Sequence, residues 1–198
     1  CKMPGTYKGA GTIIGLKDLH YALLTKDDET GVTYETPVKI APAIEATINP
    51  NATFGTLFAD DGPADAAVDI GDIDVSLNVQ DLTLEMQAAL LGHTMVAGSG
   101  ELVRKTSDVP PYMAIGFKSQ KSNGSYRYCW LLKGLLGQPT IGRRTKEGTI
   151  NFQTATITGK FLRRDYDDAW IHEADEDEGF ELATGASWFD DVEPATVP

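Results

Sequence analysis

Residues 68–80 read VDIGDIDVSLNVQ, and this stretch decides the fold. Apolar and polar residues alternate on both sides of Gly71, and the alternation shifts by one position at that glycine. A period of two indicates a β-strand with one buried face, and a phase shift at a glycine predicts a β-bulge. The opposite face is expected to be open and to carry Asp69, Asp72, Asp74, Ser76, Asn78 and Gln80.

Strand signals continue on both sides of this stretch. Asn123-Gly124 separates two alternating runs, which is a strong hairpin signal. A breaker at Asn49-Pro50-Asn51 is expected to end a short strand. The further strands are predicted at 19–25, 32–36, 44–48, 113–117, 126–132 and 150–162.

One helix is predicted, over residues 82–91. Leu84, Ala88 and Leu91 would share one of its faces, and Asp81 or Thr83 can cap its N-terminus. Gly92 stands where a left-handed residue commonly ends a helix. The predicted fold class is therefore mainly β with one α-helix.

The 198 residues suit one domain with arms, and their net charge of −12 is unevenly distributed. Residues 165–198 hold twelve acids and no Lys or Arg, and aromatic residues are spaced along them. Residues 27–101 hold fourteen acids against one Lys, whereas residues 102–164 hold twelve Lys or Arg against two acids. Such a distribution would suit head-to-tail association of several copies. The alternative is that the acidic and basic segments pair within one subunit.

No motif for catalysis, a cofactor or a metal is found. The three histidines are scattered along the chain. The acidic run that begins at residue 173 does not have Gly and Glu at the two positions where a calcium-binding loop requires them. Cys129 is expected to be a buried thiol. Tyr126, Tyr128 and Trp130 alternate with basic residues, which fits either a strand face in the core or a nucleic-acid-binding face. An enzyme is not expected.

Four stretches resemble the major tail proteins of long-tailed, non-contractile phages. The first and most specific, residues 14–28, reads IGLKDLHYALLTKDD. The others are FADDG at 58–62, the strand and helix at 74–92, and the hairpin with Arg127-Tyr128. The resemblance covers about residues 12–165.

This resemblance implies a tail tube protein of the virion, assembled in the host bacterial cytoplasm. The fold that it implies is a β-sandwich or partial barrel with one flanking α-helix. Six copies would form a ring, and each copy would lend four strands to one inner barrel. Stacked rings would enclose a tape-measure protein and later pass DNA, and their ends would meet tail terminator and baseplate or distal tail proteins. No membrane is implied, and the longest apolar runs are too short to cross one.

The resemblance also gives the polar residues a role. Asp69, Asp72, Asp74, Ser76, Asn78 and Gln80 become candidates for the tube wall facing DNA, since an acidic wall would not hold a polyanion. The alternative is that this face meets ordinary solvent. Candidates for contacts between rings or subunits are the basic Arg143, Arg144 and Lys146 and the acidic Asp60, Asp61, Asp175 and Asp177.

The expected organisation is a tube domain at 1–164, with an N-terminal arm at 1–12 and a basic loop at 137–149, and an acidic arm at 165–198. A second function stays open from the residues alone. The chain could be a monomeric β-sandwich module that binds a glycan or a host surface through Trp188 or Tyr126.

Overall fold

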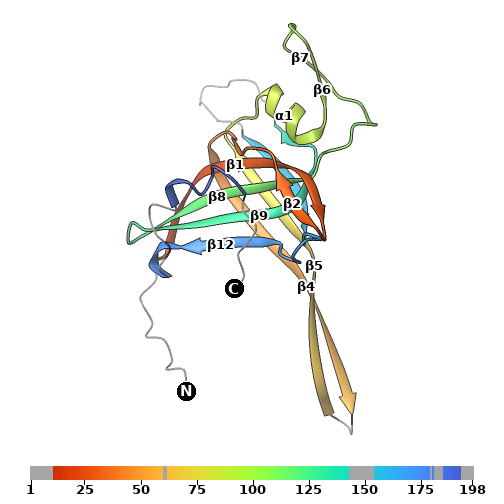
Figure 1. Ribbon diagram of the computed structural model, residues 1–198, viewed down its shortest axis with the longest axis vertical. Helices are drawn as coiled ribbons and strands as arrows, with labels where there is room; N and C mark the ends of the chain where they lie inside the picture. The colour runs from red at the N-terminus through yellow and green to blue at the C-terminus, as the bar shows by residue number, and fades with distance from the viewer. Residues whose placement is uncertain (1–10, 60–61, 143–153, 179, 181–184, 193–198) are drawn as a thin grey trace.

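A computed structural model describes residues 11–59, 62–142, 154–178, 180 and 185–192, and these residues form a mainly β fold (Figure 1). The elements are β1 (Ile13–Asp28), β2 (Gly31–Tyr34), β3 (Val38–Lys39), β4 (Ala43–Ala59), β5 (Gly62–Val79), α1 (Leu84–Leu91), β6 (Thr94–Val96), β7 (Glu101–Val103), β8 (Met113–Lys121), β9 (Tyr126–Leu136), β10 (Thr140–Ile141), β11 (Ala155–Leu162), β12 (Ile171–Asp175) and the 3-10 helix η1 (Glu176–Glu178).

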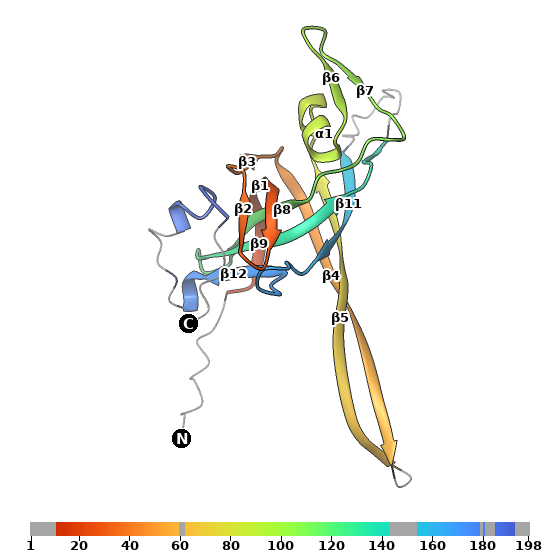
Figure 2. The ribbon, with the colours of Figure 1, turned by 45° about the vertical axis from the view of Figure 1, so that its right-hand side comes forward.

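One antiparallel sheet contains most of the strands, in the order β2-β1-β8-β9-β11-β5-β4. Three short strands join it at the side: β3 pairs with β1, β10 with β11 and β12 with β9. The sheet curls, because β1 and β4 contact one another although they are not neighbours in hydrogen bonding. Figure 2 shows that β4 and β5 continue far beyond this body, while α1 and the β6–β7 hairpin lie at the opposite end.

The main core fills the inside of the curl, and β5 shows why the sequence folds this way. Ile73, Val75, Leu77 and Val79 are all buried, whereas the residues between them are half-buried. Ile70 pairs with Ala52 and Ile73 with Pro50, so two residues of β5 oppose one residue of β4. The bulge predicted at Gly71 is thus confirmed, and it keeps the apolar residues of β5 on one face across the phase shift.

The prediction that a strand ends at Asn49-Pro50-Asn51 is wrong, because β4 runs through these residues to Ala59. Pro50 pairs with Ile73 directly beside the bulge. Among the described strands β4 pairs with β5 alone, so Pro50 lies on an edge strand, which is where sheets tolerate proline.

The helix forms where it is predicted, and Thr83 rather than Asp81 caps it. The Thr83 hydroxyl accepts from the backbone N–H of Met86, and Gly92 ends the helix with φ of 70°. The buried residues are Gln87, Leu90 and Leu91, whereas Leu84 is exposed, so the predicted apolar face was wrong at that position.

The predicted hairpin around Asn123-Gly124 is β8–β9, and it is buried on both faces. One face joins the main core through residues such as Ile115 and Leu131. The other face forms a second apolar cluster of Ala22, Ala114, Trp130, Leu132 and Val192, against which Trp188 and Phe189 pack. The aromatic residues of the acidic segment therefore dock on the sheet as predicted, and Tyr128 and Trp130 belong to the buried interior.

We call the part of the chain from β12 to Val192 the C-terminal strap, of which residues 179 and 181–184 lie outside the described ranges. The arm expected at 165–198 is less separate than predicted, because β12 pairs with β9 in the main sheet. This pairing follows from the tertiary arrangement, which leaves the edge of β9 beside residues 127–131 open to another strand.

Candidate functional site

The open face of β5 carries the polar residues that the sequence placed there. Directly paired residues of antiparallel strands share a face, so the neighbours of β5 extend this surface on both sides. We call it the polar face. Its members are Asp72, Asp74, Ser76 and Asn78 on β5, Thr156, Thr158 and Lys160 on β11, and Glu45, Thr47 and Asn49 on β4.

Charges on the polar face are linked across the strands. Lys160 binds Asp72 and lies 3.3 Å from Asp74, and the Asn51 amide donates to both carboxylates. Hydrogen bonds from Lys160 and Asn51 lower the pKa of Asp72, and those from Asn51 and Lys160 lower the pKa of Asp74. Both carboxylates are therefore ionised at neutral pH. With Glu45 the face has three carboxylates against one ammonium, so it stays acidic.

Beyond the bulge, residues 51–59 of β4 and 62–71 of β5 form a two-stranded projection that we call the ribbon (Figures 1 and 2). Phe54 pairs with Val68 and Ala52 with Ile70, so these four side chains share one face. Through the bulge this face continues the core-facing side of the sheet. Phe54 is 77% exposed, Val68 60% and Ile70 49%. The apolar side chains of the ribbon are therefore not covered by other parts of the chain as those of the core are.

The other face of the ribbon continues the polar face. Asp69 pairs with Thr53 there, and it is exposed. The last predicted member, Gln80, is exposed just after β5, where its backbone N–H donates to the Pro42 carbonyl. The structure thus brings five of the six predicted wall residues onto one side of β5, and Gln80 follows directly after the strand. The apolar ribbon face was missed, although the alternation of Val68, Asp69 and Ile70 could have indicated it.

Most residues predicted at contacts between rings are not described. Arg143, Arg144, Lys146, Asp60 and Asp61 lie outside the described ranges. Asp175 and Asp177 are described, and they form ion pairs within the chain rather than a free acidic surface.

These pairs form a buried clasp between the β8–β9 hairpin and the strap. Lys121 is 1% exposed, and its ammonium lies 2.5 Å from Asp175 and 2.8 Å from Asp177. Arg127 binds the second oxygen of Asp175 at 2.8 Å. Burial raises the pKa of Asp175, but the hydrogen bonds from Lys121 and Arg127 outweigh it, and the pKa lies below its usual range. Glu176 adds two contacts, accepting from the Tyr128 hydroxyl and the Tyr126 backbone N–H.

Other described ion pairs also join the basic segment at 102–164 to the acidic segments at 27–101 and 165–198 within one chain. Lys133 binds Asp27 at 2.7 Å and Asp165 at 2.9 Å, and Lys160 binds Asp72. Of the two alternatives for the segregated charge, these contacts support pairing within the subunit.

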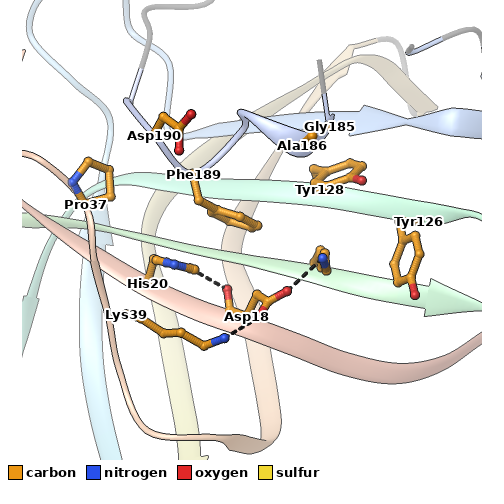
Figure 3. A pocket seen from close by; sticks show the side chains of 11 residues that line it. Asp18, His20, Pro37, Lys39, Tyr126, Tyr128, Gly185, Ala186, Phe189 and Asp190 are labelled. Carbon is orange, nitrogen blue, oxygen red and sulfur yellow. Dashed lines mark hydrogen bonds and ion pairs between the residues drawn. The ribbon is translucent and has the colours of Figure 1, made fainter. Parts of the chain in front are cut away.

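A cleft opens where the strap stops covering the sheet (Figure 3). Its floor carries Asp18, whose two carboxylate oxygens bind Lys39 at 2.5 Å and Lys118 at 2.7 Å. The hydrogen bonds from these two lysines, Lys118 first, lower the pKa of Asp18 to about 2. The His20 ring donates from Nδ1 to the Asp18 carbonyl and stacks on Phe189 with ring centres 4.5 Å apart. No local sequence signal marks this cleft, because its residues come from β1, β3, β8, β9 and the strap.

Within the described ranges, no group of three His, Cys, Asp or Glu side chains is placed to hold a metal ion. Cys129 is buried, and burial raises the pKa of its thiol. The described helix is too short to span a membrane. Trp188, one contact of the alternative binding module, packs against Tyr128 and Phe180, whereas Tyr126 lines the cleft.

No protein-family model matches the chain, and no curated protein matches it significantly. Function must therefore be argued from the surfaces described above.

Proposed function

We propose that this chain is a structural subunit that assembles with copies of itself into stacked rings, forming the tail tube of a long-tailed phage. The observation that carries the proposal is the ribbon, whose apolar face extends the core-facing side of the sheet beyond the core. A two-stranded ribbon is only marginally stable in water, and a contiguous exposed apolar surface usually marks an interface. A neighbouring copy would cover the Phe54 face.

The free edge of β4 supports the same proposal. Its seventeen residues pair only with β5 among the described strands, and a long unpaired edge invites another strand. Closing a ring removes such edges. The strands β11, β5 and β4 and the end of β9 that pairs with β11, residues 133–136, are consecutive in the sheet. They would be the four strands that each copy contributes to the inner sheet of a sandwich, where that sheet joins its neighbours.

The dimensions and charge of such a ring suit DNA passage. Six copies of four strands, spaced about 4.8 Å apart, give a circumference of roughly 115 Å and a bore of roughly 37 Å before strand tilt. The polar face would line this bore with three carboxylates per copy and one ammonium that is already paired. Such a wall offers DNA phosphates few free cations, so a duplex could slide. A tape-measure protein would fill the bore before ejection.

The test is assembly of the purified chain, followed by size-exclusion chromatography with light scattering and by negative-stain microscopy. We expect rings or tubes for the unchanged protein. Phe54→Ser should leave the thermal midpoint unchanged, since this side chain is mostly exposed, but should prevent assembly. Each lost Phe contact removes about 1.5–3 kcal/mol of burial free energy, and the loss is repeated around a ring.

Thr53→Ser is the matched control, because Thr53 neighbours Phe54 on the opposite face of the ribbon. It should assemble normally. A monomer at high concentration, or assembly of Phe54→Ser equal to that of the control, would contradict the proposal. Contacts between rings through Arg143, Arg144 and Lys146 remain a prediction from sequence, and charge reversal at Arg143 and Arg144 should shorten or destabilise the tubes.

A further inference from the structure

The cleft between the strap and the sheet has no part in the proposed tube. It lies on the side of β1, β8 and β9 that faces away from the main core, next to the second apolar cluster. The polar face lies on the opposite side of the molecule, beyond the main core. A tube lined by the polar face would therefore present the cleft outward. Because a single copy supplies every wall of the cleft, ligand binding there does not require tube formation.

The size and openness of the cleft suit a small polar ligand. Its volume is about 640 Å³, which is within the range of small-molecule sites. Figure 3 shows Asp18, His20 and Lys39 on one wall, with Phe189, Tyr128 and Tyr126 along the other. Side chains from five separate parts of the fold thus converge on one space.

Polar groups in the cleft are held in place but keep hydrogen-bonding capacity. Lys39 and Lys118 each use one N–H on Asp18, and an ammonium group has three. Asp190, exposed at the rim, adds acceptors. Asp18 has φ of 54°, a left-handed conformation that is uncommon outside glycine and is often found at binding sites. The cleft therefore offers a ligand both hydrogen-bond donors, from the two lysines, and acceptors, from the aspartates.

An aromatic surface lies next to these groups. Tyr126 is half-buried, and the ammonium groups of Lys118 and Lys17 lie 5.1 Å and 5.8 Å from its ring centre. Among the charged side chains that line the cleft, Lys39 and Lys118 are matched in number by Asp18 and Asp190. The lining is therefore balanced in charge, on a chain whose net charge is −12.

We propose that this cleft binds an acidic saccharide of the uronic acid class. A sugar has an apolar C–H face for the Tyr126 ring and hydroxyl groups that both donate and accept, which suits the mixed Lys and Asp floor. Its carboxylate would meet the free N–H groups of Lys39 and Lys118. A purely anionic ligand would leave the acceptors of Asp190 and the aromatic wall unused, and a neutral sugar would give the remaining N–H groups of the two lysines no anionic partner.

The experiment titrates the full-length chain with a hyaluronan tetrasaccharide, with oligogalacturonate and with the neutral chitotetraose, followed by calorimetry and by NMR of labelled protein. We expect at least one acidic probe to bind with a dissociation constant below about 1 mM, and chitotetraose to bind at least about tenfold more weakly. Tyr126→Leu and Lys39→Gln should each weaken acidic binding by about tenfold or more.

Matched controls are Tyr166→Leu and Lys26→Gln, which change an exposed tyrosine and an exposed lysine away from the cleft. They should leave affinity unchanged, and the thermal midpoint of every variant confirms folding. Absence of binding by both acidic probes would overturn the proposal, as would equal affinity for chitotetraose. Dextran sulfate serves as a charge-only probe. Binding of the acidic saccharides that is insensitive to Tyr126→Leu and matched by dextran sulfate would show a simple anion patch and would also overturn it.

Discussion

Replacing Lys121 with methionine tests whether the buried clasp holds the C-terminal strap in place. The side chain of Lys121 is 1% exposed and binds two carboxylates of the strap, Asp175 and Asp177. Methionine keeps most of the length and removes the charge. Lys160 provides a control with the same chemistry, because it also bridges two aspartates, but it is 63% exposed.

The expected loss depends on the charges that stay buried. Removing one partner of a buried ion pair costs about 3–5 kcal/mol, because the other charge stays desolvated without compensation. Asp175 keeps its contacts with Arg127, and Asp177 is 22% exposed, so both can be partly satisfied. We therefore expect Lys121→Met to lower the free energy of unfolding by about 2–3 kcal/mol. For a domain of this size, this corresponds to about 4–12 °C in thermal midpoint.

Urea unfolding followed by tryptophan fluorescence measures the loss, and limited proteolysis tests the strap itself. Cleavage after β12 should become faster in Lys121→Met, because its polar anchor is lost while the aromatic contacts remain. Lys160→Met should behave like the unchanged protein, since surface ion pairs contribute little. Equal stability loss in the two variants, or an unchanged cleavage rate in Lys121→Met, would refute the clasp.

Three further predictions address core packing, a buried hydrogen bond and stability at low pH. Gly116→Ala should cost about 1–3 kcal/mol, because a Cβ there would lie 2.6 Å from ring atoms of Trp130; Gly55→Ala meets nothing within 4 Å and should leave thermal denaturation unchanged. Tyr34→Phe should cost about 1–2 kcal/mol in urea unfolding, because its hydroxyl donates to a backbone carbonyl at 2.8 Å; an unchanged midpoint would contradict this. Hydrogen bonding from the clasp lysine lowers the pKa of Asp177 from 3.8 to about 2, so its contribution to stability is complete above pH 3.8 and is lost as the pH falls toward 2. Pepsin should therefore cleave the strap faster at pH 2 than at pH 4 relative to an unfolded standard, and equal relative rates would argue against this role.

Local patterns were sufficient for much of the sheet. The alternation around Gly71 predicted both the bulge and the polar face, because a strand with one buried face must alternate. Thr83 and Gly92 were recognisable as helix ends from their residue types. The β8–β9 hairpin followed from Asn123-Gly124 between two alternating runs.

The errors arose where a distant strand decides the outcome. Proline usually interrupts a strand, but β4 lies at the edge of the described sheet, where proline is tolerated, and Pro50 pairs with Ile73 there. The sequence also could not indicate that Lys121 is buried, because its partners lie more than fifty residues further along the chain.

By itself, then, the sequence determined the bulge and polar face of β5, the helix and the β8–β9 hairpin, since backbone geometry fixes such features over a few neighbouring positions. Only the tertiary structure decided which charges are paired, where the apolar face of the ribbon loses its cover, and that Asp18, Lys39 and Lys118 meet in one cleft. These features depend on contacts between segments far apart in the chain, and such contacts form only when the sheet curls and the strap closes over it.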